Sequence, residues 1–460
     1  MKTSPAPRWR LAALLLASIV LAVAGALAAP PATPDQLPPV LTIPAAAQAS
    51  AHFDAEAATN AYLAQLPAEA KTRSDAYFEG GYWLILWDFL YGAAISLLLL
   101  SLHWSAGMRN FTERITRFKA LQSLIYWAEY LLATTVLGFP LVVYEGYFRE
   151  HHYGLATQTF GPWMFDQFKA LLVGLVIGGL VTMGLFAVVR RLPRTWWIWG
   201  AVVAMAFMGV GVMIAPVYLV PIFNKVTRLD DPKITEPILS LARANGIPAH
   251  DVYVVDASRQ TTRISANVSG LGHTMRITLN DNLLRRGTPE GIQAVMGHEM
   301  GHYVLNHVYK ILMFYLIVYV AGFSLLKWGL DRCLRRWGEQ WRIRGVGDLA
   351  VLPLVMLLVS IFFFVLTPVT NTLSRTIETE ADVFGLNASR QPDGFAQILL
   401  QLSEYRKMRP GPVEEWIFFD HPSGHTRILA SMRWKAENLQ SLPPTPEPAA
   451  PAEPHPAAAN

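Results

Sequence analysis

Seven long apolar segments constrain the fold of this 460-residue chain more than any other feature of its sequence. Each segment is about 17–25 residues long, which is enough for a helix to cross a bilayer. Only 16% of the residues are charged and 52% are hydrophobic, whereas soluble domains carry about 25% charged residues. We therefore predict a mainly α-helical, multi-pass membrane protein with spans near residues 11–29, 81–102, 123–145, 167–189, 195–220, 310–330 and 350–368.

The first apolar segment fits two interpretations. Lys2, Arg8 and Arg10 precede "LAALLLASIVLAVAGALAAP", which combines a basic start, an apolar centre and an end rich in small residues. That pattern is typical of a cleaved signal peptide, and it fits a retained first transmembrane helix equally well. Residues 1–29 are therefore predicted to be one or the other.

Polar stretches between the apolar segments predict a membrane domain joined to a water-exposed domain. Two polar regions flank the last two predicted spans, and the first contains the strand-like stretches "HDVYVVDAS" and "TMRITLNDNLL". We expect both regions to lie outside the hydrocarbon and to form one domain. In chain order, we predict a Pro/Ala-rich linker and extramembrane segment at 30–80, transmembrane helices at 81–224 and the first polar region at 225–309. Two transmembrane helices at 310–372, the second polar region at 373–440 and a disordered tail at 441–460 follow.

Basic residues predict how the chain is oriented in the membrane. Lys and Arg crowd the N-terminus and residues 109–119, 190–194 and 327–344, which all fall on one side of a protein with seven spans. The positive-inside rule makes that side cytoplasmic. The two polar regions then face the other side, which is the periplasm if the membrane is a bacterial inner membrane.

Charge and cysteine content exclude several kinds of partner and site. The net charge of +4 is small, and the basic residues cluster beside apolar segments, so the lipid bilayer and not nucleic acid is the expected partner. Cys333 is the only cysteine, which excludes an internal disulfide and a cysteine-based metal site. The sequence carries no signal for an oligomeric state.

The stretch "VMGHEMGHYVLNH" contains the pattern H-E-x-x-H inside an apolar run. Residues four apart share one face of a helix, so His298 and His302 are placed to bind one Zn²⁺ together. Glu299 lies beside them and can take a proton from an attacking water. Thr288 and Pro289 supply a helix start just before the motif. Two buried histidines that bond to neighbouring groups are the alternative interpretation.

A catalytic zinc needs a third protein ligand and an open position for water. His307, five residues beyond the motif, is off the register of the metzincin pattern and is expected on a helix that continues toward the sixth span. In "NTLSRTIETEADVFGLNA", Glu378 and Asp382 are four apart, so one can bind the metal while the other holds a ligand imidazole. Ala381 and Gly385 are small enough to allow close helix packing. A solvated acidic helix face is the alternative interpretation.

A third candidate element is "FFDHPSGHTRI", which contains His421 and, six residues later, Arg427. A histidine and an arginine close to a zinc site can stabilise the oxyanion that forms when water attacks a carbonyl. The alternative is a helix-entry turn, capped by Asp420 or Ser423, with Arg427 exposed to solvent.

Together these motifs give the chain a resemblance to a known family. It resembles the integral-membrane gluzincin metalloproteases typified by the CAAX prenyl protease of the a-factor-converting type. The similar segments extend from about Tyr77 to Ile428 and read "GYWLILWDFLYG", "REHHYGLATQTFGPWMFDQFK", "APVYLVPIFNKVTRLDD", "VYVVDASRQTTRISANVSG", "ITLNDNLL", "GHEMGHYVLNH", "LSRTIETEAD" and "DHPSGHTRI".

The resemblance implies a fold and a set of roles. The fold is about seven transmembrane helices around a water-filled chamber, with a zincin-like α+β catalytic domain at its mouth. It implies one Zn²⁺ per chain, and Asp382 is then left to hold a ligand imidazole. The implied metal ligands are His298, His302 and Glu378. Glu299 is the implied general base, and His421 and Arg427 are the groups implied to assist the transition state.

Two features depart from the family pattern. The substrate-binding edge strand usually reads Asn-Ala-Tyr or similar, whereas Ser265, Ala266 and Asn267 stand there in this chain. Main-chain hydrogen bonds can still add a peptide to such an edge, but the side chain that orients the peptide has changed. The family's catalytic side also faces the cytosol, whereas the loop charges here predict a periplasmic site.

The function predicted from these features is zinc-dependent hydrolysis of peptide bonds in membrane-associated or misfolded proteins. One alternative is a membrane chaperone or scaffold that keeps the zinc for structure, although such a site has no need of Glu299. The other is a transporter, because Asp88, Glu129 and Glu145 lie within predicted spans. No inverted repeat is evident in the sequence, which argues against transport.

Overall fold

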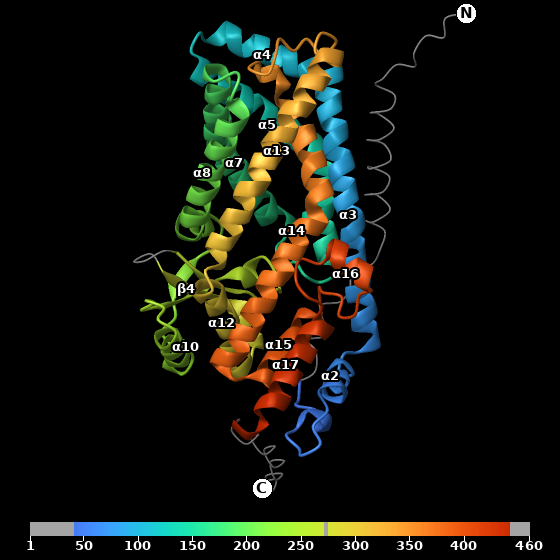
Figure 1. Cartoon of the computed structure of the whole chain (residues 1–460), viewed down its shortest axis with the longest axis vertical. Coiled ribbons are helices and arrows are strands. Elements are labelled where there is room, and N and C mark those ends of the chain that lie inside the picture. The colour runs from blue at the N-terminus through green and yellow to red at the C-terminus, as the bar shows by residue number, and fades with distance from the viewer. Residues whose placement is uncertain (1–40, 271–274, 442–460) are drawn as a thin grey trace, which may run out of the picture.

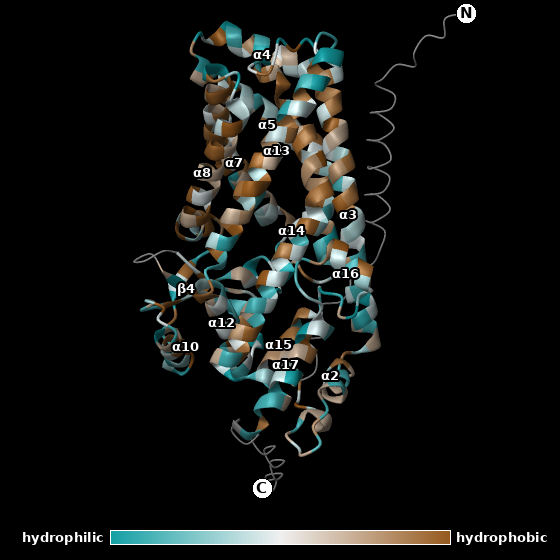
Figure 2. Ribbon diagram, viewed as in Figure 1, coloured by the Kyte–Doolittle hydropathy of each residue, from teal (hydrophilic) through white to brown (hydrophobic). Residues whose placement is uncertain are grey.

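The computed structural model describes residues 41–270 and 275–441, so the predicted segment at 11–29 and nearly all of the predicted tail lie outside the described residues. The described chain is elongated, with a helical bundle at one end and a smaller part of helices and strands at the other (Figure 1). Apolar residues run along the bundle helices, and polar residues are concentrated at the two ends of the molecule (Figure 2).

Six helices in the described part of the chain are long and apolar enough to cross a membrane. They match six of the seven predicted spans, which are thereby confirmed as helices of spanning length. Two of them are composite, Lys119–His152 and Trp196–Phe223. Their elements are α3 (Ala68–Ser101), α5 (Lys119–Val143) with η2 (Tyr144–Arg149) and α6 (Glu150–His152), α7 (Phe160–Arg191), α8 (Trp196–Ile214) with η3 (Ala215–Leu219) and α9 (Val220–Phe223), α13 (His307–Trp337) and α14 (Leu352–Ser389).

The outer surface of the bundle is apolar. Val136, Ile317 and Val365 are all more than 60% exposed, and most residues of the spanning helices lie on the surface of the bundle. An apolar surface of this extent is costly in water and favourable in hydrocarbon. The bundle therefore has the surface of a membrane domain.

Two of the spanning helices continue well past their apolar stretches. α3 begins at Ala68, although the apolar segment begins near residue 81, and α14 ends at Ser389, although the apolar segment ends near residue 368. The boundary that the sequence places between residues 372 and 373 falls inside one continuous helix. The extension of α14 carries Glu378 and Asp382 out of the bundle.

A small mixed sheet lies beside the end of the bundle where α13 begins (Figure 1). Its four strands are β1 (Val226–Arg228), β2 (Val252–Val255), β3 (Ala266–Ser269) and β4 (Arg276–Asn280), in the order β1-β2-β4-β3. β2 and β4 are parallel, and the two outer pairs are antiparallel. The two predicted strands are thus confirmed as β2 and β4, and β3 is an edge strand in the described sheet.

Shorter helices surround this sheet and complete its core. The sheet packs against α12 through buried residues that include Ile277, Leu279, Met296 and Met300. The remaining elements are η1 (Ala45–Ala47), α2 (Ala55–Leu63), α4 (Trp104–Ile115), α10 (Pro232–Ala244), η4 (Ala257–Arg259), α11 (Asp281–Arg286), α12 (Pro289–Val304), η6 (Leu349–Val351), α15 (Pro392–Leu402), α16 (Pro412–Phe418), α17 (Gly424–Asn438) and η7 (Leu439–Ser441).

The segment before α3 packs onto the C-terminal helices. Tyr62 of α2 donates a hydrogen bond to Asp393 of α15 over 2.8 Å, and Lys435 of α17 forms an ion pair with the same carboxylate. Lys435 also donates to the carbonyl of Ala47. Residues that the sequence suggested as a linker therefore form part of the core of the water-exposed domain.

Candidate metal centre and active site

Two helices bring the predicted metal ligands together. α12 carries His298 and His302, and α14, which packs against it, carries Glu378. The backbones of the two helices come close together where Gly297 faces Gly385, since a Cβ on Gly385 would lie 2.6 Å from the backbone nitrogen of His298. Only glycine leaves room for backbones this close. The close packing expected at Gly385 is therefore present.

The donor atoms of His298, His302 and Glu378 have the spacing that a zinc ion requires. The two Nε2 atoms lie 3.2 Å apart, and they lie 3.2 and 3.6 Å from the Glu378 oxygens. Tetrahedral ligands at about 2.0–2.1 Å from Zn²⁺ are about 3.3 Å from one another. Glu378 Oε2 is buried and accepts no hydrogen bond in the described part of the chain. Two imidazoles and one carboxylate are also a donor set found at catalytic zinc sites.

The buried carboxylate of Asp382 fixes the orientation of His298. Asp382 Oδ1 lies 2.8 Å from His298 Nδ1, and both of its oxygens accept hydrogen bonds from Arg427, over 2.6 and 2.8 Å. The guanidinium keeps Asp382 ionised, so the Nδ1–H of His298 donates to it. The lone pair of His298 Nε2 is then directed at the metal position, which is the role that the sequence suggested for Asp382.

A similar chain of contacts fixes His302. Its Nδ1 lies 2.9 Å from His307 Nδ1, and His307 Nε2 lies 3.0 Å from Glu380 Oε2. If His307 donates to the carboxylate, its Nδ1 accepts from His302, which leaves His302 Nε2 free for a metal. Asn306 has φ 56 and separates α12 from α13, so the chain turns there and places His307 against His302.

Glu299 lines the pocket beside the donor set. Burial raises the pKa of its carboxyl to about 7. A carboxylate with a pKa close to neutral suits a general base that must accept and release a proton in one turnover. Burial would lower the pKa of His298, but the bond to Asp382 and the nearby Glu378 carboxylate outweigh it and raise that pKa to about 9, so the imidazole has to release its Nε2 proton when it binds a metal. Burial and the neighbouring His298 lower the pKa of His302 to about 4.

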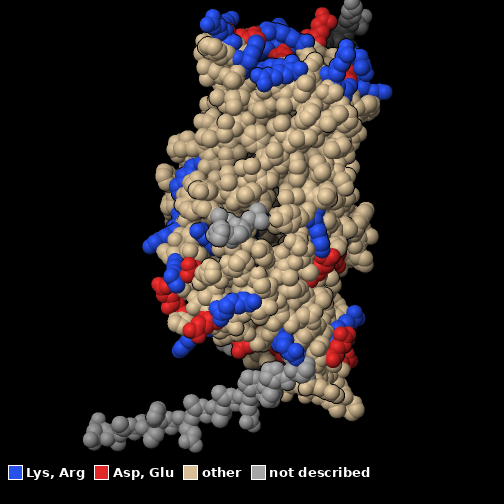
Figure 3. Space-filling model, turned by 60° about the vertical axis from the view of Figure 1, so that its left-hand side comes forward, with Lys and Arg blue, Asp and Glu red and all other residues tan. Residues whose placement is uncertain are grey.

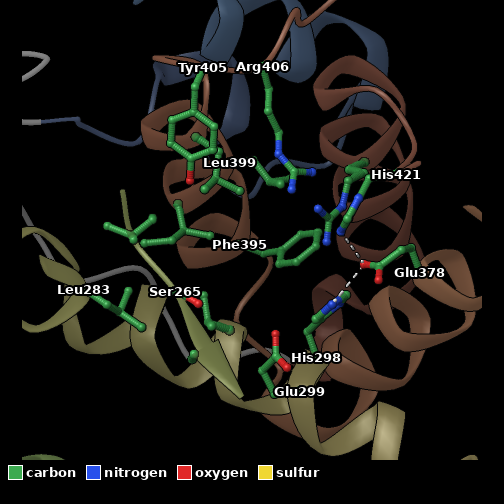
Figure 4. A pocket seen from close by; sticks show the side chains of 16 residues that line it. Ser265, Leu283, His298, Glu299, Glu378, Phe395, Leu399, Tyr405, Arg406 and His421 are labelled. Carbon is green, nitrogen blue, oxygen red and sulfur yellow. Dashed lines mark ion pairs between the residues drawn. The ribbon is translucent and has the colours of Figure 1, made fainter. Parts of the chain in front are cut away.

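His421 and Arg427 both reach the site, but His421 faces the pocket whereas Arg427 is held by a buried carboxylate. His421 Nε2 lies 3.4 Å from Glu378 Oε2 and faces the pocket (Figure 4). Ser423 caps α17, as one alternative expected, but Arg427 is buried and bonded to Asp382, so its expected exposure is wrong.

A pocket of about 220 Å³ opens beside the donor set. Ser265 and Ala266 line it from the start of β3, whereas Asn267 is exposed and does not line it. On the opposite side, the pocket is closed by side chains from α15 and the loop after it. These are chiefly apolar and include Phe395, Ile398, Leu399 and Leu402.

Sequence reasoning missed two contributors to this pocket. Tyr405 and Arg406 follow α15 and point into it (Figure 4). The guanidinium of Arg406 forms no ion pair with a carboxylate among the residues that the structure describes. Nothing in the stretch "SEYRKMRPG" marks it as part of the site, because it lies on a loop without a recognisable spacing.

This fold and this site together define a membrane-embedded metallopeptidase. The H-E-x-x-H helix carries two candidate metal donors and a buried glutamate, and a membrane helix that extends into the second domain carries the third candidate donor.

Comparison with known proteins places the chain more narrowly. A model of peptidase family M48 matches residues 228–435, and a model of the CAAX prenyl protease N-terminal region, with five membrane helices, matches residues 53–225. The uncharacterized metalloprotease YhfN of Bacillus subtilis is 32% identical over 326 residues, which cover 70% of this chain and 76% of that protein. The chain belongs to peptidase family M48, and it is a multi-pass integral membrane metalloprotease.

More distant relatives agree with this assignment. CAAX prenyl protease 1 of Saccharomyces cerevisiae is 27% identical over 326 residues, covering 67% of this chain and 72% of that protein. The crystal structure of S. mikatae Ste24p has the same fold, with a TM-score of 0.60 at 21% identity, and the match covers 94% of this chain and 100% of that one. The predicted fold class and family resemblance are thereby confirmed, whereas the water-filled chamber stays a prediction.

Proposed function

We propose that this chain is a zinc-dependent endopeptidase whose metal is held by His298, His302 and Glu378. The observation that carries the proposal is the spacing of their donor atoms, 3.2–3.6 Å between neighbours, beside Glu299 in an open pocket. A structural metal site has no use for a base and a pocket at this position. Asp382 completes the site as the group that orients His298.

Each residue has a distinct part in the proposed reaction. When bound, Zn²⁺ supplies Lewis-acid activation of a water molecule and of the scissile carbonyl. Glu299 accepts the proton of the attacking water on its carboxylate and passes it to the amine of the leaving peptide. His421 donates a hydrogen bond toward the oxygen of the scissile carbonyl as negative charge develops there. Arg427 supports this region through Asp382 and adds positive charge to it.

The edge strand β3 offers a way to hold the substrate. Its partner β4 occupies one side only, so a peptide can add to the other side as a further strand. Ser265 and Ala266 at the start of this strand lie against the pocket that contains Glu299. A peptide bound along Ser265, Ala266 and Asn267 would present its backbone to the base. Main-chain pairing of this kind is tolerant of side-chain sequence.

We propose membrane-associated or misfolded proteins as the substrates. The site lies in the domain that adjoins the membrane bundle, formed by the regions 225–309 and 373–440, so a tethered chain can reach it (Figure 1). Relatives named CAAX prenyl proteases support a membrane-linked substrate. We propose in addition that the site faces the periplasm, because the basic loops lie at the opposite end of the bundle.

Metal analysis of the purified full-length chain tests the ligand set. We expect close to one zinc per chain in the wild type and a loss of zinc in Glu378→Ala, because two imidazoles alone hold the ion weakly. Glu415→Ala is the control, since it removes a glutamate outside the donor set. Full zinc occupancy in Glu378→Ala would contradict the assignment of the third ligand.

A further inference from the structure

A second cavity lies at the end of the bundle farthest from the metal centre. Its volume is about 340 Å³. It opens where the start of α5, the end of α7, the helix α4 and the loop before η6 come together. Its charged side chains are Arg109, Glu113, Lys119, Arg190, Arg344 and Asp348.

The charges in this cavity do not balance. Asp348 is paired with Arg109 over 2.5 Å, and Glu113 is paired with Arg344 over 2.8 Å. Of the four cations and two carboxylates, Lys119 and Arg190 are therefore left over, which gives an excess of two positive charges. This excess of positive charge favours the binding of an anion in the cavity.

The two remaining cations bond only to neutral groups of the described chain. Lys119 donates to Gln122 over 3.0 Å. Arg190 donates to the carbonyl of Lys119 and to the hydroxyl of Ser123, over 3.2 and 3.3 Å. These contacts hold the Arg190 guanidinium against the main chain of Lys119 and leave both charges without a carboxylate partner among the described residues. Guanidinium and ammonium groups are both phosphate-binding groups, and one of each lines this cavity.

The cavity lies at the level of the lipid headgroups. The membrane-spanning helix Lys119–His152 begins there and Phe160–Arg191 ends there. On the face shown in Figure 3, a band of mostly basic side chains crosses that end of the molecule above a wide uncharged zone. α4 lies across this end and exposes Trp104, Phe111 and Ile115, which is typical of an interfacial helix.

An apolar groove on the face of α4 that carries Trp104 and Phe111 adds a place for an acyl chain. It runs between α4 and α5 and is lined by side chains such as Met108, Leu132 and Val136, with Glu129 as its one ionisable group. Free phosphate has no apolar part that could fill such a groove, whereas a phospholipid has a phosphate for the basic cavity and acyl chains for the groove.

We propose that this basic cavity binds the phosphate of an anionic phospholipid, with Lys119 and Arg190 as the residues that recognise it. Basic pockets between membrane helices are a known type of site for anionic headgroups. The site lies far from the metal centre, so it stands independently of the proposed peptidase mechanism.

The test compares two double variants of the full-length chain by native mass spectrometry and by thermal unfolding. Lys119→Gln/Arg190→Gln removes the two free cations from the cavity. Arg117→Gln/Arg191→Gln removes the same charge from exposed positions, which are two residues from Lys119 and one residue from Arg190 respectively. The probes are phosphatidylglycerol, phosphatidylcholine and inorganic phosphate, added to protein delipidated in a neutral detergent.

We expect phosphatidylglycerol to bind the wild type and the outer variant alike, and the cavity variant about 25-fold more weakly, because each of the two basic residues removed near the headgroup changes the affinity about fivefold. Phosphatidylglycerol should also raise the Tm of the wild type and outer variant alone. Equal weakening in both variants, or equal binding of phosphatidylcholine, would overturn the proposal. Binding of inorganic phosphate without preference for phosphatidylglycerol would overturn the lipid as the occupant. If the cavity variant fails to fold, the wild type alone decides. A preference for phosphatidylglycerol over phosphatidylcholine that inorganic phosphate does not abolish would support the proposal, and equal binding of the two lipids would overturn it.

Discussion

At the scale of single residues, Asp382 is the group on which the polar contacts of the site converge. It is 4% exposed, and it holds both His298 and Arg427. A buried carboxylate with two such partners is stabilised only while both remain in place. The residue therefore links the position of His298, a proposed metal ligand, to the C-terminal helix α17.

Asp382→Asn is expected to weaken zinc binding by about 10–100-fold, because the amide no longer holds His298 in the required tautomer. Competition with a coloured chelator measures the affinity directly. Asp331→Asn is the control, because Asp331 is far from the site and forms a partly exposed ion pair with Lys327. This variant should leave the zinc affinity unchanged. An unaltered zinc affinity in Asp382→Asn would show that the imidazole does not depend on this carboxylate.

The two arginines of the site should respond differently to substitution. Arg427→Ala leaves Asp382 buried without its partner and should cost about 3–5 kcal/mol in the free energy of unfolding. Arg406→Gln removes no ion pair, so the stability should change little, whereas kcat/KM should fall by about tenfold if the guanidinium bonds to bound substrate. Unfolding curves and peptide kinetics separate the two effects. An unchanged kcat/KM in Arg406→Gln across a peptide set would exclude that contact.

Residue spacing predicts only those parts of the site that lie on one helix. His298 and His302, and likewise Glu378 and Asp382, were predictable because residues four apart share a helix face. The contact between His302 and His307 depends on the left-handed conformation of Asn306, which no spacing rule indicates. Contacts between loops and helices far apart in sequence, such as that of Arg406 with the pocket, follow only from the three-dimensional packing.

At the scale of elements, the contact between α12 and α14 sets the geometry of the metal centre. Two donors stand on one helix and one on the other, so any change in the distance between the helices separates the ligands. Gly297 and Gly385 fix that distance through direct backbone contact.

Gly385→Ala is expected to push α14 away from α12, because the new Cβ would lie 2.6 Å from a backbone nitrogen. Overpacking of this kind costs about 1–3 kcal/mol, and zinc affinity should fall as well. Thermal unfolding and zinc titration measure the two effects. Gly92→Ala in α3 is the matched control, since nothing lies within 4 Å of its new Cβ. Identical behaviour of the two variants would contradict this account of the helix contact.

Element type was predictable where the apolar period was clear, and element length was not. Hydropathy predicted the spans because it reports which residues prefer hydrocarbon, but a helix can continue into water. α14 extends about 20 residues, or between five and six turns, beyond its apolar stretch, and this extension carries Glu378 and Asp382 to the site. The capped start of α12 at Thr288 was predictable because the cap depends on local sequence alone.

At the scale of the whole molecule, the charged ends of the bundle predict its orientation. Basic residues concentrate at the end of the bundle where α4 lies, away from α12 and its candidate metal donors (Figures 1 and 3). An alkaline phosphatase fused after residue 441 should be active if that end of the chain is periplasmic, and the same reporter inserted in the loop 338–345 should be inactive. A cytoplasmic fluorescent reporter provides the reverse control. An active phosphatase at the loop and an inactive one at the C-terminus would contradict the proposed orientation.

The measurement that tests the central claim most directly is hydrolysis of a quenched peptide library by the purified protein, run beside Glu299→Gln. The account predicts that the wild type cleaves, that a zinc chelator abolishes cleavage, and that Glu299→Gln retains zinc but loses at least about 100-fold in rate, since it loses the general base. Cleavage by zinc-loaded Glu299→Gln at the wild-type rate would contradict the proposed mechanism.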